Sequence, residues 1–210
     1  MDTDCFMNSQ KRDKRKSRRQ AGGFSLTEAV VAIAVAMILA AIGMPAFLKA
    51  YHAYQLTSAA SQLSDILRLT RYEAIRQNKT INCIIQPDGI DPTRTDVFAD
   101  ADGAPTPGPT DKIILLGPGG NIVDGGGVPG VTALLTKANV SGGTGTTTAT
   151  PGNMTIRFDS RGAVNPPNVT IFYVASAQAP DAGYRAVLLM PAGSIQIWNG
   201  DSAGNWIQLR

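Results

Sequence analysis

The pattern of hydrophobic and polar positions divides the chain into three regions. Residues 1–23 are polar and basic, and the sixteen residues 29–44 carry no charge at all. A helix over residues 24–48 would be about 37 Å long, which is enough to cross a hydrocarbon core of about 30 Å. The pattern therefore predicts a membrane-spanning helix after a leader segment that takes no part in the fold.

Helical periodicity continues beyond the apolar segment. Apolar residues recur every three or four positions from Leu56 to Ala74, with polar residues on the opposite face. Pro45 lacks an N–H, so it either ends the helix or bends it, and we expect a bend because the periodicity resumes. Residues 24–48 and 49–79 then form the apolar and amphipathic halves of one helix of about 50 residues. The single apolar stripe of the second half needs a sheet to cover it.

Short β-branched runs separated by glycine and proline turns fill residues 80–210. Several alternate apolar and polar positions, which is typical of a half-buried antiparallel sheet. Glycine-rich residues 117–130 and 141–152 are expected to be loops. The fold class is therefore α+β, with a long N-terminal helix packed on a β-rich domain. The expected strands are residues 80–86, 96–99, 112–116, 131–135, 154–158, 168–174, 184–190, 194–198 and 206–209.

The net positive charge of the chain comes from its leader and not from its domain. The sequence has 19 Lys and Arg against 16 Asp and Glu, a formal net charge of +3. Residues 1–23 hold seven of the basic residues and three aspartates, which leaves 12 basic and 13 acidic residues for the rest. The basic balance therefore does not indicate a nucleic-acid partner. Basic residues beside a membrane span instead predict a cytoplasmic leader, with the bulk of the chain across the membrane.

The residue types that carry catalysis or bind metals are few. His52 is the one histidine, and Cys83 is the one cysteine outside the leader, where we expect it to be a buried small hydrophobe. Asp100 and Asp102 resemble the start of a calcium loop, but Ala104-Pro105-Thr106-Pro107 supplies none of the later oxygen ligands. A turn formed by Asp and Gly explains this stretch. We therefore expect no enzyme activity and no cofactor, and Asp100 and Asp102 stay as metal candidates.

One carboxylate, Glu28, lies inside the apolar segment, close to the Gly23-Phe24 junction. A charge within a membrane span costs roughly 2.5–3.5 kcal/mol on insertion scales, so it indicates a function and a partner. The spacing of Gly23, Phe24, Glu28 and Pro45 resembles the N-terminal signal of type IV pilins and type II secretion pseudopilins. The resemblance implies that a prepilin peptidase cleaves between Gly23 and Phe24, that Phe24 is N-methylated, and that Glu28 and Pro45 serve assembly.

Residues 56–60, 69–75, 97–103 and 156–162 resemble the corresponding segments of the minor members GspH and FimT of that family. This implies the pilin fold, partners that are other pilin or pseudopilin subunits bound through the N-terminal helix, and a single-pass location in the inner membrane with the bulk in the periplasm. It implies a role in a type II secretion pseudopilus or a type IV pilus.

Two other functions fit parts of the sequence. A DNA-binding minor pilin for natural transformation is one, but FimT relatives of that kind resemble one another in a Gly-Arg-x-Arg pattern, and residues 193–196 here lack both arginines. Arg157 and Arg161 remain as DNA-contact candidates, and nucleic acid is not the expected partner. The other is a signal-anchored periplasmic protein unrelated to fibres, cleaved by ordinary signal peptidase near residues 41–43. That interpretation leaves Glu28 without a purpose.

Overall fold

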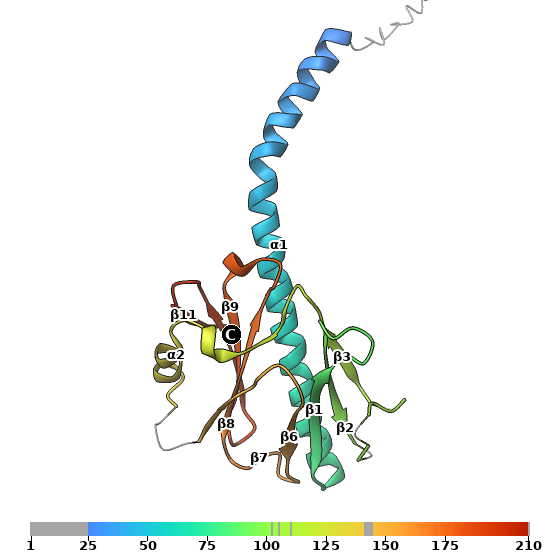
Figure 1. The fold of residues 1–210 in the computed structure, drawn as a ribbon, viewed down its shortest axis with the longest axis vertical. Helices are drawn as coiled ribbons and strands as arrows, with labels where there is room; N and C mark the ends of the chain where they lie inside the picture. Colours follow the sequence, from blue (N-terminus) through green and yellow to red (C-terminus); the bar gives the residue numbers. More distant parts are fainter. Residues whose placement is uncertain (1–24, 102, 105, 110, 141–144, 210) are drawn as a thin grey trace, which may run out of the picture. The chain divides into compact units, whose positions relative to one another are not determined.

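The structure is a computed structural model that describes residues 25–101, 103–104, 106–109, 111–140 and 145–209 (Figure 1). It divides into two compact units, Met1–Gly43 and Met44–Arg210. Helix α1 (Leu26–Gln77) is 52 residues long and contributes to both units. The sequence therefore predicts this helix correctly as a single element that combines an apolar and an amphipathic half.

Helix α1 ends where its sequence predicts. The N–H of Asn78 donates to the carbonyl oxygen of Ile75, and the N–H of Lys79 donates to the carbonyl oxygen of Ala74, both at 3.2 Å. Asn78 has a φ of 49°, in the left-handed region that asparagine adopts more readily than most residues. These two bonds form a helix-ending motif that satisfies carbonyl groups at the last turn. The chain then enters the first strand.

The unit Met44–Arg210 contains two β-sheets. In sheet A the strand order is β3-β2-β1-β6-β7, and in sheet B it is β11-β10-β9-β8-β4, with β5 paired to β8. The β5–β8 pairing is parallel, and the other described pairings are antiparallel. The strands are β1 (Ile81–Pro87), β2 (Thr95–Asp100), β3 (Ile113–Leu116), β4 (Asn121–Val123), β5 (Thr146–Thr148), β6 (Met154–Phe158), β7 (Val164–Asn165), β8 (Val169–Ala175), β9 (Tyr184–Leu189), β10 (Ile195–Gly200) and β11 (Trp206–Leu209).

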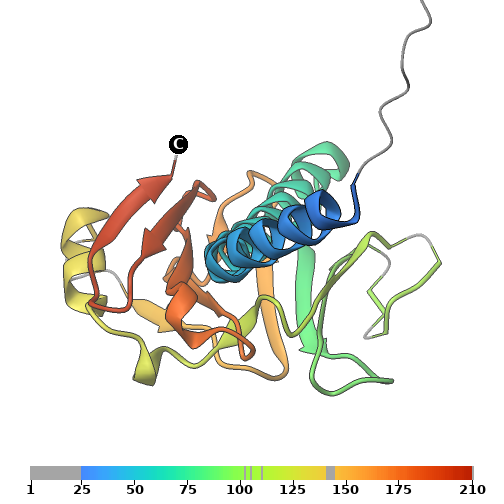
Figure 2. The ribbon, with the colours of Figure 1, turned by 90° about the horizontal axis from the view of Figure 1, so that it is seen from above.

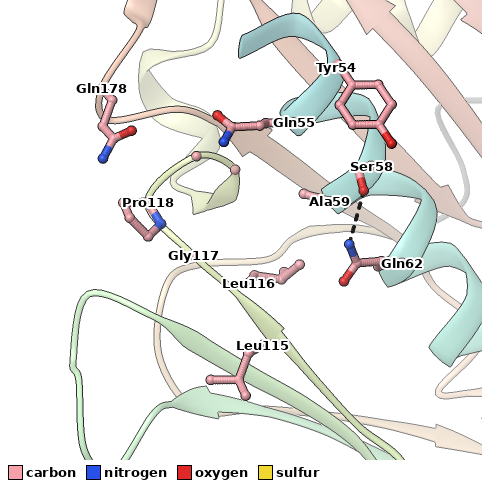
Figure 3. A pocket seen from close by; sticks show the side chains of 12 residues that line it. Tyr54, Gln55, Ser58, Ala59, Gln62, Leu115, Leu116, Gly117, Pro118 and Gln178 are labelled. Carbon is pink, nitrogen blue, oxygen red and sulfur yellow. Dashed lines mark hydrogen bonds between the residues drawn. The ribbon is translucent and has the colours of Figure 1, made fainter. Parts of the chain in front are cut away.

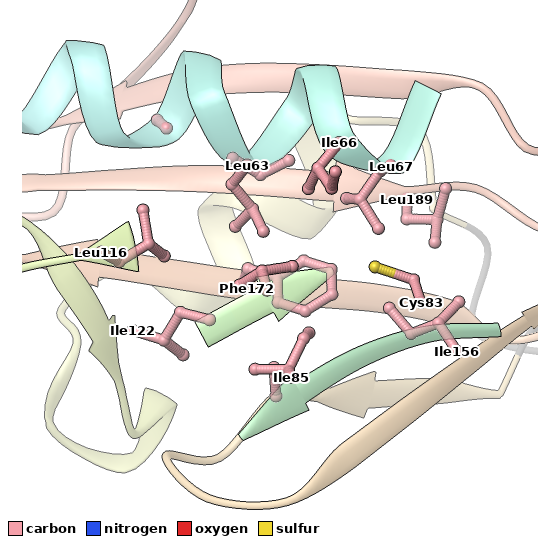
Figure 4. Packing of buried hydrophobic residues seen from close by; sticks show 14 of the residues in the cluster. Leu63, Ile66, Leu67, Cys83, Ile85, Leu116, Ile122, Ile156, Phe172 and Leu189 are labelled. Atoms are coloured by element: carbon pink, nitrogen blue, oxygen red, sulfur yellow. The ribbon is translucent and has the colours of Figure 1, made fainter. Parts of the chain in front are cut away.

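The main core lies between the amphipathic half of α1 and the two sheets. In both views sheet A lies on one side of this part of the helix and sheet B on the other (Figure 1 and Figure 2). Leu63 and Leu67 are completely buried and point toward the sheets, near Phe172 of sheet B and Cys83 of sheet A (Figure 4). The expectation that Cys83 is a buried small hydrophobe is confirmed. One helical stripe thus joins both sheets in one core.

A second core lies on the other face of sheet B, beneath the short helix α2 (Val131–Lys137). The prediction of a strand over residues 131–135 is wrong. The helix starts after Gly130, which has a left-handed φ of 69°, and it buries Leu134 in one cluster with Trp206. Lys137 Nζ donates to the carbonyl oxygen of Trp206 at 2.9 Å. Leu134 is the one fully buried residue of the seven, and a helix buries it while the residues on either side stay exposed or partly exposed.

Three short strands lie in segments whose sequence predicted none. Strand β4 lies in the glycine-rich residues 117–130, and β5 lies in the glycine- and threonine-rich residues 141–152. Strand β7 is only two residues long and pairs with the end of β6. Two turns of 3-10 helix, η1 (Gly125–Gly127) and η2 (Pro180–Ala182), complete the described elements. The remaining strands are observed within two residues of their predicted bounds.

Candidate functional site

The first unit presents an apolar helix surface that the described protein does not cover. Helix α1 is long and apolar enough to cross a membrane, and no residue in its most apolar 18-residue window is buried. Apolar side chains exposed on every side of a helix need lipid or neighbouring helices around them. The large apolar side chains of this part, each at least half exposed, are Leu26, Val30, Val31, Ile33, Val35, Met37, Ile38, Leu39 and Ile42.

Glu28 is the one charged residue among residues 25–43. It lies in the first turn of α1 and is exposed, and its position near the N-terminus of a helix favours a negative charge. The side-chain oxygens of Ser25 and Thr27 lie 2.8 Å apart beside it, and the N–H of Ala29 donates to the carbonyl oxygen of Ser25 at 3.0 Å. A cation for Glu28 must therefore come from outside residues 25–43. The expected cleavage site at Gly23 and Phe24 lies outside the described residues.

Pro45 lies inside α1, and the helix continues to Gln77. The interpretation in which Pro45 ends the helix is therefore wrong, while the bend remains a prediction. Beyond it the rings of Phe47 and Tyr51 stack with centroids 6.5 Å apart, and both side chains are about half exposed or more. Exposed aromatic rings at the end of an apolar segment are typical of the membrane–water interface. This region marks the boundary between the apolar and amphipathic halves of α1.

Arg185 of β9 fixes the amphipathic half of α1 to sheet B. Its Nε donates to Thr57 Oγ1 at 3.1 Å, its Nη2 donates to the carbonyl oxygen of Ala53 at 3.4 Å, and its Nη1 donates to the carbonyl oxygen of Tyr184 at 3.0 Å. The side chain is buried, which lowers the pKa of its guanidinium. Sequence patterns gave no signal for this contact, because 128 residues separate Arg185 from Thr57. A buried guanidinium does not offer its charge to phosphates.

The turn between β9 and β10 occupies the place where a Gly-Arg-x-Arg pattern would align. Gly193 has a φ of 79°, and a Cβ there would lie 2.1 Å from the carbonyl oxygen of Gly162. The carbonyl oxygen of Gly193 accepts a bond of 3.1 Å from Arg71 Nη1 of α1. Arg157 and Arg161 are both exposed, and neither guanidinium has a hydrogen bond or ion pair among the described residues. The turn therefore packs against α1 and against the turn that holds Gly162, which directly follows Arg161 in the chain.

Asp100 serves a turn in this structure. Its Oδ1 accepts a bond of 2.6 Å from the N–H of Gly103, and its Oδ2 accepts one of 3.3 Å from Asn82 Nδ2. Gly103 has a left-handed φ of 87°, as the Asp–Gly turn requires. The other metal candidate, Asp102, lies outside the described residues. Within the described part of the chain, no group of three His, Cys, Asp or Glu side chains is placed to hold a metal ion.

Comparisons with known proteins identify two matching regions. The family model described as type II transport protein GspH matches residues 59–193, which is more than half of the chain. The model of the prokaryotic N-terminal methylation motif matches residues 18–44. The comparison with curated proteins found no match. The methylation motif includes the junction between Gly23 and Phe24, and the other match runs from the middle of α1 to the turn before β10.

Two crystal structures of the type IV minor pilin FimU from Pseudomonas aeruginosa are similar to this chain. In space group P21 the identity is 18% and the TM-score is 0.39, and the similarity covers 75% of this chain and 94% of FimU. In space group P65 the identity is 19% and the TM-score is 0.40, with 74% and 98% covered.

Proposed function

This chain belongs to the GspH family of type II transport proteins, and we propose that it is a non-catalytic subunit of a type II secretion pseudopilus or a type IV pilus. It is a minor pseudopilin or pilin that carries the N-terminal methylation motif. In this proposal residues 1–23 are the leader, 24–48 the membrane and assembly helix, 49–79 the amphipathic half of that helix, and 80–210 the periplasmic domain. The single observation that carries the proposal is the exposed apolar helix with one carboxylate in its first turn.

Cleavage by prepilin peptidase between Gly23 and Phe24 would supply the cation that Glu28 lacks. It releases a free amine at Phe24, four residues before Glu28 in the sequence. Both charges are costly in a low-dielectric bundle of helices, and pairing them relieves both. If the amine of one subunit pairs with Glu28 of its neighbour, only one alignment of the two helices satisfies both groups. The pair would therefore set the register of the subunits in the fibre.

The apolar half of α1 gives the subunit two successive environments. Before assembly it lies in the inner membrane as a single span, with the basic leader in the cytoplasm and the domain in the periplasm. During assembly, neighbouring pilin helices replace lipid around the same exposed side chains. The partners that follow from this proposal are prepilin peptidase, other pilin or pseudopilin subunits, and the inner membrane.

Substitution of Glu28 tests the proposal. We expect Glu28→Ala to be cleaved, to remain in the membrane, and to keep the melting temperature of the domain, because the domain does not contain this residue. We expect the variant to be lost from the sheared or purified fibre fraction, where the wild-type chain is found. Thr27→Ala, in the same helical turn, is the matched control and should be incorporated like the wild type. Normal incorporation of Glu28→Ala would contradict the proposed pairing.

A further inference from the structure

A groove runs along α1 beside sheet A. It consists of two adjoining cavities of about 410 and 360 Å³ that share Gln62 as a lining residue. Its helix wall extends from Tyr54 to Leu69, and its other wall is formed by β3 and the residues just before and after it. Figure 3 shows the larger cavity, between Tyr54 to Gln62 of the helix and the chain from Leu115 onward. We call this feature the α1–β3 groove. All of its lining residues belong to the unit Met44–Arg210.

The wall opposite the helix is the free edge of a sheet. Strand β3 pairs with β2 and is the outermost strand of sheet A. Ile114 and Leu115, which point to opposite faces of the sheet, both line the groove, so the groove follows the strand's edge. In an antiparallel ladder alternate residues turn their N–H and C=O groups away from the partner strand. On the outer edge of β3 these groups have no hydrogen bond among the described residues.

The side chains of β3 itself carry no charge, although the strand is only four residues long. Natural sheets cover or charge their edges to prevent pairing with other chains. Here the residues on the outer face of β3 are aliphatic, with Ile113 41% exposed and Leu115 51% exposed. Lys112 precedes the strand at one end. The edge is therefore suited to accept another strand.

From Tyr54 to Gln62 the helix wall offers uncharged hydrogen-bonding groups, and Asp65 lines the groove beyond them. Gln62 Nε2 donates to Ser58 Oγ at 3.1 Å, and both side chains line the groove (Figure 3). The buried Oε1 of Gln55 has no hydrogen-bond partner in the described protein. Carboxamides and hydroxyls match the donors and acceptors of a peptide better than they match an ion. This chemistry favours a polypeptide as the occupant.

One end of the groove is closed by the chain after β3, which crosses α1. A Cβ on Gly119 would lie 2.8 Å from Gln55 Oε1, and a Cβ on Gly120 would lie 2.8 Å from the Cβ of Ala59. Glycine at both positions permits this close crossing. The crossing therefore brings the chain after β3 into direct contact with α1 at this end of the groove.

We propose that an extended segment of a neighbouring fibre subunit lies in the α1–β3 groove and adds a strand to sheet A. The inference rests on the proposed function, which supplies the neighbour. From Tyr54 to Leu69 the helix wall is about 22 Å long, which accommodates about seven residues of extended chain. Tyr54 continues the exposed aromatic face of Phe47 and Tyr51 at helical spacing, so a neighbour that packs on this face also contacts the groove at Tyr54.

Hydrogen exchange measured by mass spectrometry tests this strand addition on the full processed chain. In detergent the peptide containing β3 should exchange rapidly at its outward amides, and in the purified fibre its exchange should slow at least about tenfold. The peptide containing β11, an edge strand of sheet B, is the internal comparison. Unchanged exchange in β3 combined with new protection in residues 25–43 would overturn the inference and leave the proposed function standing. Absence of the chain from the fibre would overturn both.

Two charge substitutions provide a second test. Leu115→Lys places a charge on the edge that should accept the strand, and we expect its incorporation into the fibre to fall at least about tenfold. Ile207→Lys places the same charge on β11, an edge strand of sheet B, where the side chain is 66% exposed, and it should be incorporated like the wild type. Both variants should keep the melting temperature of the wild-type domain within a few degrees. Wild-type incorporation of Leu115→Lys would overturn the inference.

Discussion

Truncation of Leu63 or Leu67 to alanine tests whether the apolar stripe of α1 belongs to the core of its own domain. Both leucines are 0% exposed and lie in the cluster that joins α1 to the two sheets (Figure 4). Each truncation removes three carbon atoms, which corresponds to about 2.4 kcal/mol at about 0.8 kcal/mol per buried methylene. The cavity left behind increases this, and comparable truncations span about 2–5 kcal/mol. We therefore expect each variant to lose about 3 kcal/mol of unfolding free energy.

Thermal unfolding followed by circular dichroism measures this loss on the soluble domain that begins near Ala50. For a domain of this size 1 kcal/mol corresponds to about 2–4 °C, so each leucine variant should melt about 6–12 °C below the wild type. Ile207→Ala, at a position that is 66% exposed, is the control and should melt within about 2 °C of the wild type. A loss below about 2 °C at both leucines would refute the reasoning, because it would show that the stripe does not form the core of this domain.

Three further predictions concern the same domain. Burial raises the pKa of the Cys83 thiol from 9.0 to about 12, so the unfolded chain loses this proton first as the pH rises. The free energy of unfolding measured by denaturant titration should therefore be about 1 kcal/mol lower at pH 10 than at pH 8, and Cys83→Ala should remove most of this difference. Gly193→Ala should lower the melting temperature more than Gly103→Ala, because both positions have a positive φ but only Gly193 has a carbonyl oxygen in the place of the new Cβ. Mobility-shift assays with the soluble domain at micromolar concentration and near-physiological salt should show no binding of duplex DNA. Salt-sensitive binding that is lost in Arg157→Ala or Arg161→Ala would favour a role in DNA uptake instead.

The sequence predicts the long helix and most strands because their signals are local. The repeat from Leu56 to Ala74 identifies the buried face of α1, and alternation identifies strands such as β10. Strand β5 has no such signal, because three threonines become a strand only by pairing with β8, more than twenty residues later. The sequence of helix α2 indicates a strand because it is short and β-branched at the start, and its burial against Trp206 depends on distant residues.

The candidate site also has a part that a local residue pattern predicts and a part that only the folded chain reveals. The spacing of Gly23, Phe24, Glu28 and Pro45 is a linear pattern that sequence alone reveals. The Arg185 contact with α1 and the α1–β3 groove join segments that lie far apart in the chain, so only the folded structure brings them together. The groove also depends on the outer edge of β3, whose backbone groups have no hydrogen bond among the described residues. No residue pattern in the sequence predicts this unpaired edge.

The most direct test of the account is the intact mass of the chain recovered from membranes and fibres of cells that carry a prepilin peptidase. We predict a single product that runs from Phe24 to Arg210 with one added methyl group on the N-terminal amine, and a Gly23 variant with a bulky side chain should accumulate as the uncleaved chain. A product that begins near Met44, or a full-length chain inside the fibre, would contradict the account.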